Sequence, residues 1–409
     1  MERIIGSRQA AGPAIIALAA AAVYALAFGL RQAQPLFIGS LNSQTGVGYA
    51  AISLAFGVAQ LVWGFAQPVA GAVADRFGPR RVMIGGAMLL AAANSAVPFV
   101  HDAVVLTLII GIAAAAGAGT LGPAMLMGAA SRWIPEAKRS MAHGIINAGG
   151  SFGQFTIVPL AQVLIGIAGW QATMVLLGLS GLAVIPLLTL VASASPAPAR
   201  VAGAAGGGSV GSALRDALRN PSYLLLNAGF FTCGFHVAFI VTHLPGVVAL
   251  CGLPAQVSAW SVSLIGLFNL MGSLWIGRFV RQRRMKLALA GLYLARALII
   301  VAFFFSPKTP ATFFVFACAI GFTYLSTVPP TAGLVAKLCG TRYLATLFGI
   351  VMVSHQVGGF LGASLGGKVF EASGSYDWMW FADIALCLAA ALVHLPIREA
   401  KPTPALAPA

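Results

Sequence analysis

The chain has 409 residues, of which 59% are hydrophobic and 8% are charged, and its formal net charge is +15. A soluble domain carries about a quarter charged residues, and a water-soluble fold of this size could not hide so much apolar surface. The sequence therefore predicts a membrane protein. Nucleic-acid binding is excluded as the reason for the charge, because the basic residues form short clusters between apolar runs rather than one polar face.

The apolar runs are long enough to cross a bilayer, which takes about 20 residues. We expect an all-α membrane protein with about twelve transmembrane helices, because small residues and Pro are tolerated within such helices. The expected limits are 13–35, 46–73, 82–100, 104–130, 140–165, 169–192, 221–246, 256–277, 286–305, 310–335, 343–369 and 376–396.

Most of the 24 Lys and Arg residues fall in loops that would lie on one side of the membrane. The positive-inside rule then predicts cytoplasmic termini, and a bacterial inner membrane is the expected location. A segment rich in Pro, Gly, Ala and Ser, 193–220, reads as a flexible linker whose end, "SALRDALRN", could form an interfacial helix. The expected domains are a six-helix bundle at 1–192, this linker, and a six-helix bundle with a cytoplasmic tail at 221–409.

The two halves carry a weak internal repeat at a shift of 205 positions. Such repeats are common in transporters and place a site between the halves. The matching pairs are "GLR" at 29–31 with "GFH" at 234–236, Gly144-Ile145 with Gly349-Ile350, and Gly153 with Gly358.

The loop "GAVADRFGPRR" at 71–81 combines turn-forming Gly with basic residues that favour an anionic leaflet. Its spacing resembles the signature loop of the major facilitator superfamily, a loop that acts as a conformational switch. The matching residues are Gly71, Asp75, Arg76, Gly78, Arg80 and Arg81. The resemblance covers nearly the whole chain.

Two further segments, 131–178 and 344–367, resemble the monocarboxylate-transporter-like branch that includes oxalate–formate exchangers. This resemblance implies two pseudo-symmetric six-helix bundles around a cavity lined by helices one, four, seven and ten. The eighth span departs from the pattern, because Asn269 and Ser273 stand near the places of an acidic residue and an Arg. That departure leaves a neutral or amphipathic solute open as the cargo.

Arg31 is a charge inside the first span, toward the end we expect to be outer. A basic residue at the centre of a span costs about 2.5–3.5 kcal/mol or more. It could reach outward to headgroups, or it could bind an anion in the cavity, where a planar guanidinium grips a carboxylate in two places. His236 occupies the repeat position in span seven. It could face Arg31 across the cavity and carry a proton, or it could be hydrogen-bonded within its bundle.

Other polar residues inside the spans complete the expected site. His355 lies mid-span in helix eleven, where the resembling exchangers use a basic residue, although a packing or gating role is as plausible. Pro329-Pro330 should bend span ten and free carbonyls toward the cavity. The expected substrate-binding residues are Arg31, Gln34, His236, Asn269, Tyr324, His355 and Gln356, with His236, His355 and Asp383 as proton-coupling candidates.

Arg296 in span nine and Asp383 in span twelve should lie at similar depths, at about 1.5 Å of rise per residue. We expect a buried structural ion pair, with proton coupling through Asp383 as the alternative. A lone Asp at that place would protonate or destabilise the bundle.

The chain contains no phosphate-binding loop, metal-ligand cluster or nucleophile arrangement, so no enzyme activity, cofactor or metal is expected. The first hypothesis is a secondary transporter of a small organic anion, coupled to protons or a counter-substrate. The second is a transporter of a neutral solute, such as a vitamin or an exported drug, and the third is a non-transporting receptor. Partners would be the small-molecule substrate and membrane lipids, with no nucleic acid, and we expect a monomer.

Overall fold

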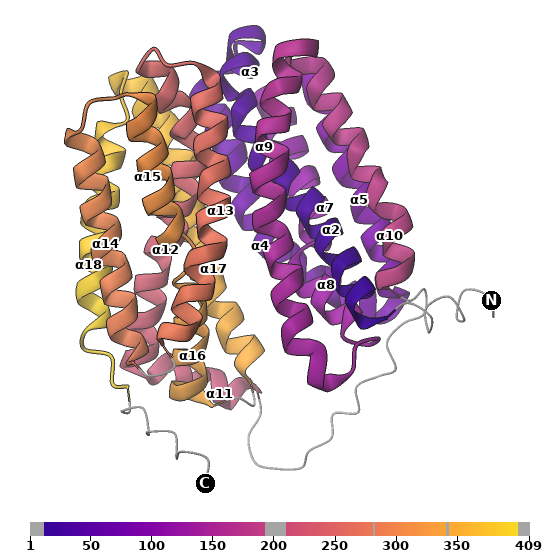
Figure 1. Cartoon of the computed structure of the whole chain (residues 1–409), viewed down its shortest axis with the longest axis vertical. Helices are drawn as coiled ribbons and strands as arrows, with labels where there is room; N and C mark the ends of the chain where they lie inside the picture. Colours follow the sequence, from indigo (N-terminus) through magenta and orange to yellow (C-terminus); the bar gives the residue numbers. More distant parts are fainter. Residues whose placement is uncertain (1–11, 193–209, 281–282, 341–342, 400–409) are drawn as a thin grey trace.

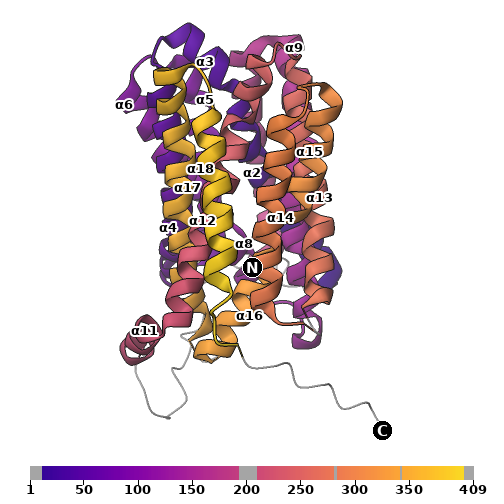
Figure 2. The ribbon, with the colours of Figure 1, turned by 90° about the vertical axis from the view of Figure 1, so that its left-hand side faces the viewer.

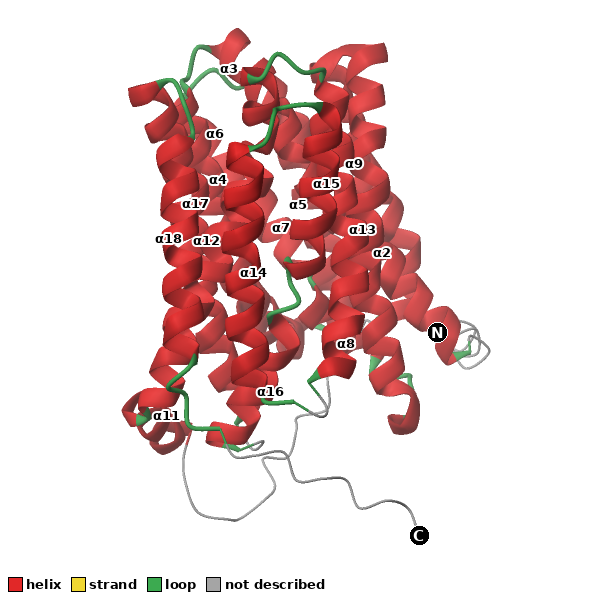
Figure 3. Cartoon of the chain, turned by 60° about the vertical axis from the view of Figure 1, so that its left-hand side comes forward, coloured by secondary structure: helices red, strands yellow, loops and turns green. Residues whose placement is uncertain are grey.

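The computed structural model describes residues 12–192, 210–280, 283–340 and 343–399, and within these ranges it contains helices and loops but no strand (Figure 3). Eleven helices in these ranges are long and apolar enough to cross a membrane. The protein is therefore an all-α, multi-pass membrane protein, as predicted.

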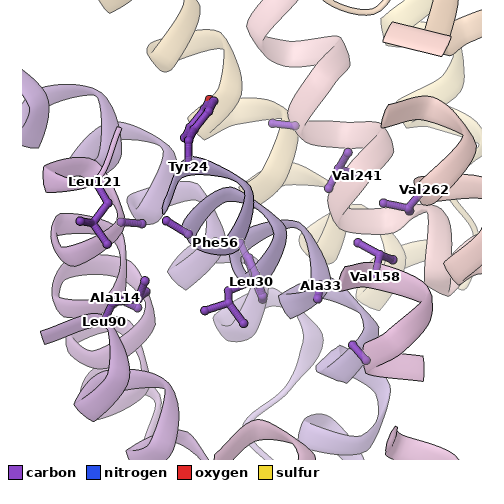
Figure 4. Close-up of a cluster of buried hydrophobic side chains, with 14 of the residues drawn as sticks. Tyr24, Leu30, Ala33, Phe56, Leu90, Ala114, Leu121, Val158, Val241 and Val262 are labelled. Carbon is purple, nitrogen blue, oxygen red and sulfur yellow. The ribbon is translucent and has the colours of Figure 1, made fainter. Parts of the chain in front are cut away.

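The first half of the chain, here the N-terminal half, forms one group of helices (Figure 1). Side chains from α2, α4, α5 and α9 meet in its core, including Leu30, Phe56, Leu90 and Val158 (Figure 4). The elements are α2 (Pro13–Ala33), η1 (Gln34–Phe37), α3 (Ile38–Thr45), α4 (Tyr49–Phe77), α5 (Pro79–Ala96), η2 (Val97–Phe99), α6 (Ala103–Leu106), η3 (Thr107–Ala114), α7 (Ala115–Thr120), α8 (Pro123–Ala130), α9 (Glu136–Ser180), η4 (Gly181–Ala183) and α10 (Val184–Val191).

The second half, here the C-terminal half, forms the other group (Figure 1). It contains α12 (Pro221–Leu250), α13 (Ala255–Phe279), α14 (Met285–Phe305), α15 (Pro310–Thr323), α16 (Val328–Cys339), α17 (Leu344–Ser373) and α18 (Asp377–His394). Of the expected linker, 193–209 lies outside the described residues. Its end is a helix, α11 (Val210–Arg219), which lies at the foot of the bundle in Figure 2.

The longest apolar run, Glu136–Val191, has 56 residues. A straight helix of that length would measure about 84 Å, far beyond the roughly 30 Å core of a bilayer. The backbone turns at Gly169, whose φ of 78° and ψ of 166° lie outside the helical region and suit a residue without a Cβ. The run therefore supplies spans five and six, which brings the crossings to twelve.

Span one is longer than expected. Pro35 does not end it, because the 3₁₀ turn η1 carries the chain onward into α3 and the run continues to Thr45. Pro is tolerated in the first turn of such a segment, where its missing N–H is not needed. Arg31 consequently lies near the middle of this 33-residue run and not toward its end, which corrects the expected depth.

The repeated glycines mark the places where helices cross most closely. A Cβ on Gly153 would overlap the backbone of Ala25 on α2, and a Cβ on Gly358 would overlap the backbone of Phe231 on α12. The helix pairs α2/α9 and α12/α17 therefore approach backbone to backbone, as small residues allow in membranes. The two halves use the same packing device at the same repeat position.

The halves meet through α4 against α17 and through α9 against α13. The Glu371 carboxylate of α17 accepts a hydrogen bond from the Ala50 N–H of α4, at 2.8 Å. Further along the same pair, Gly64 faces the side chain of Gln356. The ribbons are closest near α3 and diverge toward the opposite end, where α8, α11 and α16 lie (Figure 1). We call that divergent end the basic end, because it holds the junction of α4 and α5, which carries Arg76 and Arg80, and the helix α16, which carries Lys337.

Two of the spans are interrupted in the middle. Span four stops at Thr120 and resumes at Pro123, and span ten stops at Thr323 and resumes at Val328. A helix end leaves carbonyl groups without partners inside the helix, so the break in span ten supplies acceptors within the C-terminal half. Pro329-Pro330 predicted a bend in span ten, and the break lies just before these residues.

Candidate functional site

We call the region where the N-terminal and C-terminal halves face each other the seam. Arg31 lies on α2 at this seam. Its Nη2 donates a hydrogen bond to Gln60 Oε1 of α4, and its Cζ lies 4.8 Å from the centre of the Trp63 ring. The side chain remains partly exposed. A guanidinium held by one amide and one aromatic face keeps other N–H groups free for a carboxylate.

Tyr324 faces this guanidinium from the C-terminal half. Its hydroxyl donates to the Val237 carbonyl at 3.1 Å, and its ring is close enough to Arg31 and Gln32 to interact with both side chains. Tyr324 begins the break in span ten, so its main chain belongs to an irregular segment and its side chain to the seam. The structure thus brings together Arg31 and Tyr324, and their expected role in binding substrate stays a prediction.

Asn269 joins the break in span ten to the opposite half. Its Oδ1 accepts from the Leu325 N–H at 3.0 Å, and its Nδ2 donates to Ser151 Oγ of α9 at 3.1 Å. Both ends of the amide are therefore engaged by protein, and the side chain is 7% exposed. This geometry makes Asn269 a positioning residue in this conformation and does not support its expected role as a substrate ligand.

His236 does not face Arg31, which corrects the expectation from the repeat. The side chain is fully buried, and its Nδ1 lies 2.7 Å from Asp383 Oδ2 of α18. Gly234, two residues earlier on α12, packs against the His355 backbone of α17, and His236 points instead toward α18, within its own half. His236 is thus the hydrogen-bonded histidine that the sequence left as an alternative.

The expected ion pair between Arg296 and Asp383 is also wrong. Among the described residues, the ion-pair partner of Asp383 is His236. The Nη2 of Arg296 donates instead to the carbonyls of Thr323 and Tyr324, which the break in span ten exposes. These hydrogen bonds are strong, because a charged donor such as a guanidinium forms stronger hydrogen bonds than a neutral donor does.

His236, Asp383 and Cys387 place ligand-type atoms within 4.8 Å of one another. The Cys387 Sγ donates weakly to Asp383 Oδ1, at 3.7 Å. The Arg296 guanidinium interacts electrostatically with the same thiol. A permanent positive charge at full burial opposes binding of a cation. We therefore describe this group as a hydrogen-bonded pair with a neighbouring thiol and assign it no metal.

The remaining expected residues occupy different environments. The Gln34 amide donates to Asn94 of α5 at 2.7 Å, so it packs inside the N-terminal half and not at the seam. Gln356 lies at the seam against Gly64. The His355 ring packs 5.2 Å from the Phe230 ring, and neither of its nitrogens has a hydrogen-bond partner among the described residues.

The loop between α4 and α5 turns at Gly78, whose φ is 87°. Only Gly adopts this region readily, which explains the Gly at this place in the signature. Asp75, Arg76 and Arg81 are exposed at the basic end, and their expected switch role stays a prediction.

The fold and the seam define a transporter made of two similar halves. The model of the Major Facilitator Superfamily matches residues 16–363, and the chain belongs to this family. It is accordingly a transporter and not an enzyme.

Relatives agree with this assignment, and a solved structure shares the fold. Monocarboxylate transporter 13 of Bos taurus is 26% identical and aligns over 91% of this chain and 86% of its own. The oxalate:formate antiporter of Oxalobacter formigenes is 28% identical over 59% of this chain and 57% of its own. A bacterial homolog of the human lysosomal transporter Spinster, solved inward-facing and unoccupied, superposes with a TM-score of 0.70 at 16% identity, over 93% and 92% of the two chains.

Sequence reasoning missed several residues that hold the site. Trp63 and Ser151 belong to no recognisable motif. Their partners, Arg31 and Asn269, come from other helices, so the sequence did not reveal these contacts. Gln60 was one of several polar residues in apolar spans, and the sequence offered no way to choose among them. The acid in span twelve was visible, but its partner depended on how α12 is rotated.

Proposed function

We propose that this transporter moves a small, monocarboxylate-like organic anion by alternating access, coupled to protons or to a counter-substrate. The observation that carries the proposal is the position of Arg31 at mid-depth between the halves, steadied by Gln60 and Trp63. A charge at this depth is costly unless it is paired or functional. A carboxylate that enters the seam would find a bidentate partner already oriented.

The two relatives named for carboxylate transport support the same class of cargo. The orientation is also part of the proposal. If the basic end faces the cytoplasm, as the positive-inside rule predicts, the structure is closed toward the outside and diverges toward the inside. The hydrogen bond from the Ala50 N–H to the Glu371 carboxylate would then stabilise the closed outer end.

A neutral or amphipathic solute remains the second candidate. The observation that favours it is α13, which carries no charged residue before Arg278 and uses the Asn269 amide for protein contacts. The Arg that the resembling carboxylate carriers place in this helix is absent. A cargo without charge would need only the aromatic and amide groups of the seam.

Uptake into proteoliposomes tests the two candidates. Labelled formate, oxalate and lactate are supplied with and without a pH gradient, and uptake is measured for the wild type, Arg31→Gln and Arg31→Lys. We expect Arg31→Gln to lose at least about tenfold in uptake, because a charge-assisted bidentate contact disappears. Arg31→Lys should retain part of it.

The matched control is Arg215→Gln, which removes an exposed positive charge on α11, outside the spans. It should transport like the wild type. Normal carboxylate uptake by Arg31→Gln would show that the guanidinium does not bind the cargo. Uptake of a neutral solute that excess carboxylate fails to inhibit would favour the second candidate.

A further inference from the structure

Two guanidinium groups and one carboxyl group lie away from the ends of the spans in the described part of the chain. Arg31 faces the seam, while Arg296 and Asp383 are fully buried in the C-terminal half. With the carboxyl group ionised, the three carry one net positive charge. An interior of low dielectric disfavours any net charge. A monovalent anion beside Arg31 would therefore balance the interior, whereas a divalent anion would leave it one negative charge in excess.

His236 is built to supply a compensating charge. An ionised carboxylate only accepts hydrogen bonds, so in the neutral ring the hydrogen at Nδ1 points to Asp383 Oδ2, at 2.7 Å. The lone pair then resides on Nε2, which is buried and has no hydrogen-bond partner among the described residues. A proton that binds there forms an N–H bond and gives the ring one positive charge, which the paired carboxylate stabilises.

The titratable and charged groups near this pair come from several helices of the C-terminal half. Cys387 donates weakly to Asp383, and both Arg296 and Cys233 interact electrostatically with that thiol. Tyr293, Tyr324 and His355 interact in turn with Cys233. The acid of this group is Asp383, and it already binds the ring.

Tyr324 connects this pair with Arg31. Its hydroxyl bonds to the carbonyl of Val237, the residue that follows His236. Arg296 holds its main chain, and its ring interacts with Arg31. A change in charge on either side of Tyr324 therefore acts on one short segment at the break in span ten.

We propose that His236 Nε2 binds one proton when the anion at Arg31 carries two negative charges, and none when it carries one. This inference rests on the proposed function and extends it, because it states which cargo moves with a proton. The proton comes from the solution on the side to which the seam is open. The buried pair is thus a positioning element for charge and does not touch the cargo.

The test compares oxalate, a dianion near pH 7, with formate, a monoanion. In proteoliposomes, His236→Gln should lose oxalate uptake at least about tenfold, since one interior charge stays unbalanced. Formate uptake should remain near that of the wild type and serves as the internal control for folding. His394 is another buried histidine of this half; its Nδ1 bonds to the Ala390 carbonyl, and its Nε2 has no hydrogen-bond partner in the part of the chain that the structure describes. His394→Gln should leave both activities unchanged.

A second readout does not need transport. Nitrogen-15 NMR of histidine-labelled protein, with the His236 signal assigned by its loss in His236→Gln, should show Nε2 protonated with oxalate and neutral with formate. Equal effects of His236→Gln on the two anions, in either direction, would overturn the proposal. If the wild type carried neither anion, the proposed function would fail, and a His236 signal that stays neutral from about pH 5 to 8 would separately rule out the proton site.

Discussion

The glycine at the crossing of α2 and α9 offers a quantitative test of the packing. In Gly153→Ala, the added carbon would lie 2.6 Å from Ala25 Cα and closer still to its carbonyl. Ordinary contacts between carbon atoms are about 3.5–4.0 Å, so the helices must separate by roughly 1 Å. Overpacking of this kind costs about 1–3 kcal/mol.

The chain contains a matched control nine residues earlier on the same helix. A Cβ on Gly144 meets nothing within 4 Å, so Gly144→Ala should gain helix propensity, about 0.8–1 kcal/mol. The two substitutions should therefore differ by about 2–4 kcal/mol in free energy of unfolding. The difference in thermal midpoint should be about 2–5 °C for a chain of this length, with Gly153→Ala lower.

Thermal unfolding of the purified protein in detergent, followed by light scattering or intrinsic fluorescence, measures both midpoints. The repeat positions allow the same comparison in the C-terminal half. A Cβ on Gly358 would overlap the backbone of α12, whereas a Cβ on Gly349 would meet nothing within 4 Å. Equal midpoints for Gly153→Ala and Gly144→Ala would show that α2 and α9 do not cross where the structure places them.

Two further predictions concern the ends of the bundle. Glu371→Ala removes the acceptor for the Ala50 N–H, which joins α17 to α4. Spin labels on the exposed ends of α3 and α17 should then report a longer mean distance in pulsed electron paramagnetic resonance. An unchanged distance distribution would show that this hydrogen bond does not hold the two halves together. Glu399→Ala leaves Lys337 and the start of α14 without their carboxylate and should lower the free energy of unfolding by about 1–3 kcal/mol. A midpoint equal to that of the wild type would contradict this assignment.

The number and approximate limits of the spans could be read from the sequence, because each crossing needs a continuous apolar run. The signature loop predicted the family, and the repeated glycines predicted a duplicated bundle. The predicted end of span one was wrong, because the chain stays helical past Pro35 instead of ending there.

The partners of the buried polar residues could not be derived in the same way. α12 is buried on nearly all sides, and an apolar helix without a polar face does not encode its own rotation. Two residues at equal depth, such as Arg296 and Asp383, therefore look like a pair until the azimuth of each helix is known.

The sequence by itself determined a multi-pass carrier of the Major Facilitator Superfamily with a charge inside its first span, because hydrophobicity and local turn chemistry act along the chain. Only the tertiary structure decided that Asp383 binds His236 and that Arg296 holds the broken backbone of span ten. The physical reason is that hydrogen bonds between helices depend on rotation and on the location of free carbonyls, and both are set by packing among several helices at once.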